Sequence, residues 1–205
     1  WPEEPVLREQ LEWFQDQKLA LMVHWGVYNQ LGMVASWALS DEDAEWSRKT
    51  VDWTDDGEVF KRQYRALNRA FDPVAFQPEE WAKMAKECGF RYLILTTKHH
   101  DGFCLWDTAY TEYKTTAEDC PFHTHKYADI VRAMFDAFRN EGLGIGAYFS
   151  KADWHCPNYW EKEKALTGKT TRNPTYDPKE NPEAWERFRA FTRDQILELG
   201  KQYGR

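Results

Sequence analysis

Three short apolar runs along the chain predict buried β-strands, at residues 19–23, 92–97 and 145–149. None of them alternates strictly between apolar and polar positions, which is typical of strands covered on both faces in a parallel sheet. Each run is followed by a segment in which apolar residues recur at helical spacing. Alternating strands and helices predict an α/β fold of parallel βα units joined by right-handed crossovers.

Capping residues and glycines predict where the helices begin and end. The helix before the second strand is expected to stop at Gly89. A longer helix over residues 125–140 is expected to begin after Thr124 and to stop at Gly142. A third is expected to open at Asn181, because a capping residue followed by proline is a common helix start. The first of these helices also carries an apolar stripe at i, i+3, i+4 and i+7, formed by Trp81, Met84, Ala85 and Cys88.

Two long connections follow predicted strands. Residues 26–78 form an insert with one short helix near residues 58–67, for which Asp55 and Asp56 are the capping candidates. Residues 161–180 are rich in Lys, Glu, Thr, Asn and Pro and predict a second loop. Such loops follow the carboxyl ends of strands, where α/β folds bind ligands. No change of composition marks a linker, so the sequence predicts a single domain.

Size and charge argue against several classes of partner. The 205 residues suit one domain, and 34 acidic against 27 basic side chains give a net charge of −7. That sign is wrong for a protein that must neutralise phosphates, so we expect no nucleic-acid partner. The longest apolar runs fall far short of the roughly 18 residues that a bilayer span needs, so no membrane partner is expected either.

The cysteine, glycine and aromatic residues limit which kinds of functional site the sequence predicts. The four cysteines lie far apart without a C-x-x-C pair, so they are interpreted as ordinary thiols. The glycines at 142–146 precede a strand instead of following one, which is the wrong context for a dinucleotide site, and no cofactor is expected. The 11 Trp, 10 Tyr and 12 Phe exceed what a core of this size requires, so some are expected to face a ligand.

Polar rings stand at or near the end of all three predicted strands. His24 follows the first, His99 and His100 follow the second, and Tyr148 lies near the end of the third. A single histidine beside a tryptophan is more often a core residue, but agreement between three strand ends favours a common pocket. Neutral imidazoles exchange hydrogen bonds with sugar hydroxyls while indole rings pack on the sugar's apolar face.

Metal and acid–base candidates are fewer. His99 and His100 are adjacent, and adjacent side chains on a strand point to opposite faces, so this pair is a poor metal site and no metal is expected. Among the carboxylates, Glu45 is the candidate for catalysis, because Trp46 follows it directly. No G-x-S-x-G motif supports a serine nucleophile.

Several of these segments, taken in order, resemble one enzyme family. They are H-W-G-V-Y at 24–28, A-E-W at 44–46, F-D-P at 71–73 leading to E-W-A-K at 80–83, T-K-H-H-D-G-F-C-L-W-D at 97–107, and Y-F-S at 148–150 with D-W at 153–154. The series resembles the α-L-fucosidases of glycoside hydrolase family 29 and covers nearly the whole chain. The K-H-H-D-G-F-x-L-W string is its most specific part.

The resemblance implies a fold, a reaction and roles for individual residues. The fold is a (β/α)8-type barrel, of which residues 1–205 would be the N-terminal portion, with the first three βα units and a long insert after the first strand. The reaction is hydrolysis of α-L-fucosyl linkages in glycans by a retaining mechanism, in which two carboxyl groups lie about 5–5.5 Å apart. The implied sugar-binding residues are His24, Glu45, Trp46, His99, His100 and Tyr148, with Trp106 as a weaker candidate behind them.

One departure limits the implied activity. The family's nucleophilic aspartate follows a later strand, beyond Arg205, so this segment alone is expected to be inactive. A non-catalytic fucose- or glycan-binding module is the alternative, and a metal-dependent hydrolase using His24, His99 and His100 is a third. The expected partner is a fucosylated glycan or fucoside, and a homo-oligomer stays open. The resemblance suggests a periplasmic, secreted or lysosomal location.

Overall fold

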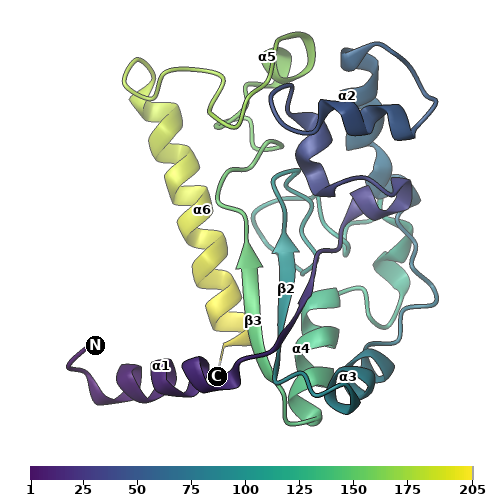
Figure 1. Cartoon of the computed structure of the whole chain (residues 1–205). Coiled ribbons are helices and arrows are strands. Elements are labelled where there is room, and N and C mark those ends of the chain that lie inside the picture. The colour runs from purple at the N-terminus through teal and green to yellow at the C-terminus, as the bar shows by residue number, and fades with distance from the viewer. Residues whose placement is uncertain (205) are drawn as a thin grey trace.

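A three-stranded parallel sheet organises the molecule (Figure 1). The computed structural model describes residues 1–204. The strands β1 (Ala20–Val23), β2 (Tyr92–Lys98) and β3 (Gly144–Phe149) lie side by side in the order in which they occur along the chain. The prediction of three parallel strands in an α/β fold is therefore confirmed, with boundaries within one residue.

The described residues form six α-helices around and above this sheet. They are α1 (Pro5–Gln17), α2 (Gly57–Arg65), α3 (Pro78–Glu87), α4 (Ile130–Asn140), α5 (Lys162–Thr167) and α6 (Pro182–Tyr203). In Figure 1 the helices α3 and α4 lie on one side of the sheet, α6 runs beside β3, and α1 extends to the left at the end of the sheet where the strands start. The helices α2 and α5 lie beyond the arrowheads, at the carboxyl end of the strands. The long insert thus stands over the end of the sheet where polar rings were expected.

Most predicted helix ends agree with the structure. Gly89 and Gly142 follow their helices with φ angles of 83° and 76°, a left-handed conformation that glycine adopts at little cost. The Asp56 side chain accepts hydrogen bonds from the first amides of α2, and Asn181 caps α6 in the same way. The start expected after Thr124 is wrong. Residues 121–124 form a short 3₁₀ helix, and α4 begins at Ile130.

The prediction failed at three other places. The helix α1 was not predicted, and α5 lies within residues 161–180, which were predicted as a loop. The apolar stripe expected on α3 is also wrong, because Met84 and Cys88 are exposed. Its buried side chains are Pro78, Ala82 and Ala85, so the face that packs inward is rotated from the expected one.

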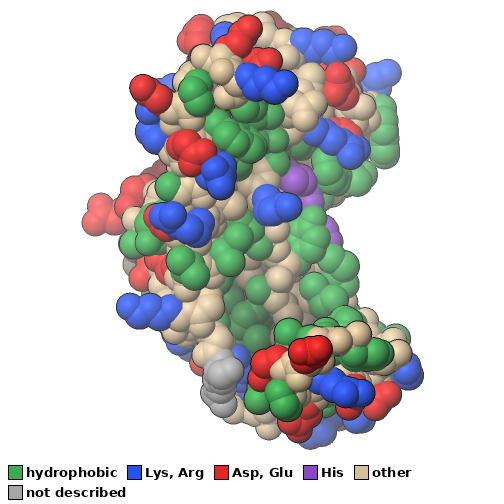
Figure 2. All heavy atoms as spheres, turned by 90° about the vertical axis from the view of Figure 1, so that its left-hand side faces the viewer, with side chains coloured by type: hydrophobic (Ala, Val, Ile, Leu, Met, Phe, Trp, Pro, Cys, Tyr) green, Lys and Arg blue, Asp and Glu red, His purple; other side chains and the backbone are tan. Residues whose placement is uncertain are grey.

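The core is rich in aromatic side chains, while part of the sheet is open. Trp106, Trp154 and Trp160 are almost fully buried. An apolar groove of about 460 Å³ runs between β3 and α6. Figure 2 shows hydrophobic side chains along the concave side of the molecule above α1, with histidine side chains at its upper edge. None of the helices described in residues 1–204 is both long and apolar enough to cross a membrane.

Candidate functional site

The three strand ends bring their polar rings together. His24 follows β1, His99 follows β2, and Tyr148 lies in β3. The His24 ring centroid lies 5.5 Å from that of His99 and 5.2 Å from that of Tyr148. The rings of His99 and Tyr148 are nearly parallel, with centroids 6.1 Å apart. Because parallel strands end at one edge of a sheet, these rings form a single cluster. We call His24, His99, His100 and Tyr148 the histidine cluster.

Hydrogen bonds to Nδ1 fix the proton positions on two of these imidazoles. The backbone N–H and the hydroxyl of Ser36 lie 3.4 and 2.5 Å from Nδ1 of His99. Because an amide nitrogen only donates, this Nδ1 accepts, and Nε2 of neutral His99 carries the proton. Nδ1 of His100 lies 2.9 Å from the carbonyl oxygen of Ala152, which only accepts, so this Nδ1 is protonated and Nε2 of His100 is an acceptor.

The imidazoles of the cluster are neutral at pH 7. Burial lowers the pKa of His99 to about 3, with smaller contributions from the neighbouring His100 and His24. Burial also lowers the pKa of His100 and of His24 below their ordinary value. The cluster therefore offers a hydrogen-bond donor on one ring and an acceptor on the next, without a net charge.

An ion pair beneath the cluster ties three elements together. Nζ of Lys98 donates to Oδ2 of Asp153 at 2.8 Å and to Oε1 of Gln195 at 2.8 Å. The side chain of Lys98 is 0% exposed and that of Asp153 is 2% exposed. Burial alone would raise the pKa of Asp153, but the ion pair and hydrogen bond from Lys98 outweigh it, and the pKa lies below its ordinary value. The end of β2, the loop after β3 and α6 are thus joined at one buried charge pair.

A second buried carboxyl connects the loop after β2 to the insert. Asp101 accepts hydrogen bonds from the Tyr64 hydroxyl at 2.9 Å and from the Phe103 N–H at 3.1 Å. Burial raises its pKa to about 7. Gly102 follows with φ of 82°, and a Cβ there would lie 2.6 Å from Oδ1 of Asp153, so only glycine fits this turn.

Tryptophans form the wall of the cluster. The ring centroid of Trp37, from the insert, lies 4.9 Å from that of His100 and 5.5 Å from that of His99. Trp154 stacks on His100 with centroids 4.9 Å apart. The guanidinium of Arg172 lies over the Trp37 ring, with its carbon 4.8 Å from the ring centre. Trp154 belongs to the D-W motif of the family resemblance, but the sequence pattern did not predict Trp37 or Arg172 as neighbours of the site.

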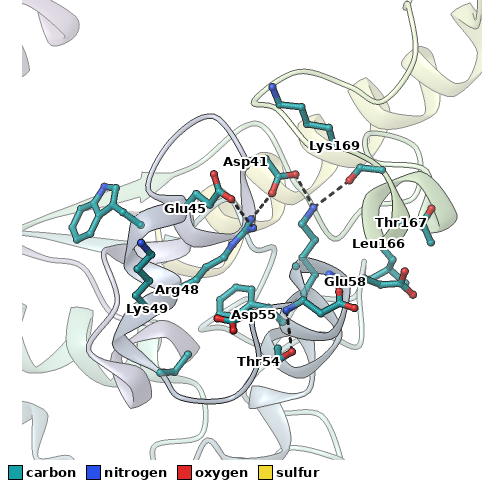
Figure 3. A pocket seen from close by; sticks show the side chains of 17 residues that line it. Asp41, Glu45, Arg48, Lys49, Thr54, Asp55, Glu58, Leu166, Thr167 and Lys169 are labelled. Atoms are coloured by element: carbon teal, nitrogen blue, oxygen red, sulfur yellow. Dashed lines mark hydrogen bonds and ion pairs between the residues drawn. The ribbon is translucent and has the colours of Figure 1, made fainter.

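Two predicted site residues lie elsewhere. Glu45 and Trp46 line a cavity of about 930 Å³ between the insert, α2 and α5, and none of the clustered histidines lines it (Figure 3). An Oε1 oxygen of Glu45 lies 3.9 Å from Nη1 of Arg48, which in turn pairs with Asp41. The structure therefore does not bring Glu45 and Trp46 into contact with the histidine cluster.

Trp106 lies inside the core. Its side chain is 0% exposed, and its indole N–H donates to Oε2 of Glu198 in α6 at 2.9 Å. It thus has no exposed surface for a sugar and contributes by packing. Within residues 1–204, no group of His, Cys, Asp and Glu side chains is arranged to hold a metal ion.

Comparison with known proteins identifies the family. The model of the α-L-fucosidase family matches residues 2–205. The chain belongs to the α-L-fucosidase family. Plasma α-L-fucosidase of Rattus norvegicus is 29% identical over 154 residues, which are 75% of this chain and 32% of that protein. Alpha-L-fucosidase 1 of Arabidopsis thaliana is 34% identical over 134 residues, which are 65% of this chain and 21% of that protein.

Solved structures of α-L-fucosidases have the same arrangement of elements. A glycoside hydrolase family 29 α-L-fucosidase from Bacteroides thetaiotaomicron is 31% identical, with a TM-score of 0.70 over 98% of this chain and 39% of that one. An α-L-fucosidase from Lactobacillus casei, solved with its α-L-fucose product, is 29% identical, with a TM-score of 0.69 over 96% of this chain and 58% of that one. The chain thus spans about a third or less of the curated relatives described above and 39–58% of these two solved chains.

Proposed function

We propose that this chain carries the fucose-recognition face of an α-L-fucosidase, and that its three βα units are part of a (β/α)8-type barrel. The family and the relatives named above support a fucoside as ligand. So does the similarity to a bacterial fucosidase solved with an iminocyclitol inhibitor, which is 31% identical to this chain. The partial barrel is supported by the parallel sheet, in which β1 and β3 each have one edge that no strand within residues 1–204 pairs with.

The observation that carries the proposal is the meeting of His24, His99 and Tyr148 from three strands. Each hydroxyl of fucose both donates and accepts, and the Nε2–H of His99 beside the accepting Nε2 of His100 matches that requirement. Trp37 supplies an apolar surface next to both imidazoles, which suits the methyl group and apolar face of a deoxy-sugar.

The proposed reaction is retaining hydrolysis by two carboxyl groups, with the nucleophile outside residues 1–205. The carboxylates near the cluster are already engaged. Asp153 is held by Lys98, and Asp101 is bonded to Tyr64 and to a backbone amide. Glu45 enters the proposal through the family resemblance alone. We therefore expect the 205-residue chain to bind L-fucose and to leave an aryl α-L-fucoside unhydrolysed.

Isothermal calorimetry with L-fucose tests the binding, with L-rhamnose as the stereochemical control. His100→Leu removes one neutral hydrogen bond and should weaken fucose binding by about two- to tenfold. His123→Leu, in the loop before α4, is the matched control and should bind normally. Absence of saturable fucose binding, or equal loss in both variants, contradicts the proposal. Turnover of the aryl fucoside by the 205-residue chain contradicts the assignment of the nucleophile to another segment. A longer chain that binds and still fails to hydrolyse favours the non-catalytic module.

A further inference from the structure

Arg172 is held beside the histidine cluster by a strap formed by residues 168–173. The backbone N–H of Thr170 donates to Oδ2 of Asp41 at 2.7 Å, and the N–H of Asp41 donates to the carbonyl oxygen of Thr170 at 2.9 Å. The Tyr159 hydroxyl donates to the carbonyl oxygen of Arg172 itself at 2.7 Å. A segment that follows β3 is thereby fastened to the insert that follows β1, and the backbone of Arg172 is fixed over it.

The guanidinium of Arg172 is fixed as well. Its Nε donates to Oδ1 of Asp43 at 2.6 Å, and its Nη2 donates to the same oxygen. The Asp43 side chain is 7% exposed, whereas that of Arg172 is 65% exposed. The guanidinium carbon lies 4.8 Å from the centre of the Trp37 ring, which also contacts the imidazoles of His99 and His100. The cation and the cluster therefore share one indole ring as a neighbour.

This arrangement leaves a set of oriented hydrogen-bond donors facing solvent. A guanidinium has five N–H groups, and the bonds to Asp43 use two of them. Among the described residues, the remaining N–H groups, including both on Nη1, have no acceptor. A buried carboxylate, a stacked indole and a fixed backbone have already restricted the side chain, so binding through it costs less rotamer entropy than binding through a free arginine.

We propose that Arg172 is a specificity-determining residue that binds oxygen atoms of the sugar to which the fucose is attached. The inference rests on the proposed function, because it places that second sugar beyond Trp37 when fucose occupies the histidine cluster. Hydroxyl, ring and acetamido oxygens are all acceptors for the free N–H groups of Arg172. Removing the guanidinium leaves the 7%-exposed carboxylate of Asp43 without its partner, so urea unfolding first checks that Arg172→Met is folded at the assay temperature. If it is not, the double variant Arg172→Met with Asp43→Asn, which has no unpaired charge at this position, replaces it in the titrations.

The test compares L-fucose with disaccharides in which L-fucose is α-linked to galactose or to N-acetylglucosamine, all titrated into the 205-residue chain. The wild-type chain should bind at least one disaccharide more tightly than L-fucose. Arg172→Met, which keeps the length of the side chain and removes its donors, should lose about three- to tenfold in affinity for that disaccharide. Its affinity for L-fucose should stay within about twofold of wild type. Arg187→Met, at another exposed arginine, should leave both affinities unchanged.

The outcomes separate this inference from the function on which it rests. If the wild-type chain does not bind L-fucose, the proposed function is wrong. If L-fucose binds but no disaccharide binds more tightly, Arg172 does not contact a second sugar. The same conclusion follows if Arg172→Met weakens L-fucose and disaccharide equally, because Arg172 would then only support Trp37. A retained disaccharide preference in Arg172→Met also overturns the inference.

Discussion

The buried pair of Lys98 and Asp153 gives the sharpest test of how the candidate site is held. In Lys98→Met the side chain keeps its length, but Asp153 loses the ammonium at 2.8 Å and remains buried. Removing one partner of a buried ion pair costs about 3–5 kcal/mol. Asp153 still accepts backbone hydrogen bonds from His155 and Cys156 at 2.9 and 2.8 Å, so the cost is expected near the lower end, about 3 kcal/mol.

A double-mutant cycle separates the pair from packing changes. Asp153→Asn alone leaves Lys98 buried with Gln195 and the Phe149 ring, whose centre lies 4.3 Å from Nζ. The double variant Lys98→Met with Asp153→Asn contains no buried charge at this position. It should therefore be less destabilised than the sum of the single variants, by about 2 kcal/mol or more.

Urea unfolding followed by tryptophan fluorescence and circular dichroism at pH 7 measures all three variants. The pH dependence supplies a second readout. In wild type the pKa of Asp153 lies below its ordinary value of 3.8. The resulting stability is fully present at pH values above 3.8 and is lost as the pH falls below 3.8. Without Lys98, burial instead raises that pKa, so Lys98→Met should recover part of its deficit at pH 5. Additive single losses, or a cost below about 1 kcal/mol, would show that Lys98 and Asp153 do not stabilise each other.

Other expectations concern the same region. The pKa of His99 is about 3 instead of 6.5, so neutral His99 stabilises the fold fully above pH 6.5, and this stability is lost as the pH falls toward 3. His99→Gln should therefore flatten the dependence of the urea unfolding midpoint on pH between 6.5 and 3. Gly102→Ala should lower the melting temperature because its Cβ would lie 2.6 Å from a carboxylate oxygen, whereas Gly200→Ala, in open space on α6, should raise stability by about 0.5–1 kcal/mol. Trp106→Phe removes the bond to Glu198 and should cost about 1 kcal/mol by urea unfolding, and an unchanged midpoint would contradict that role.

The fold was largely predictable because buried parallel strands carry continuous apolar runs and their helices end at glycine. Two omissions have different causes. The helix α1 has a visible apolar stripe at Leu7, Leu11 and Phe14, so its signal was present in the sequence. Those side chains are exposed in the structure, which shows that helical spacing does not reveal whether a stripe has a partner. The helix α5 is short and mostly polar, and its composition matches a loop.

The candidate site was predictable only where the strands define it. The rule that parallel strands end at one edge of a sheet was sufficient to bring His24 and Tyr148 together. It gives no position for side chains on long connections. Trp37 and Arg172 are 135 residues apart in sequence and meet only because the strap folds back onto the insert. Trp46 lies on the same insert and faces another cavity, which no sequence spacing distinguishes.

The opposite protonation of His99 and His100 has a stereochemical consequence. A hydroxyl that bridges the two imidazoles must approach with its lone pair toward one ring and its hydrogen toward the other. Inverting the carbon that bears this hydroxyl would break both contacts at once, so an epimeric sugar would lose about 1–3 kcal/mol of binding free energy. Two neighbouring neutral imidazoles can in this way discriminate the configuration of one carbon without any formal charge.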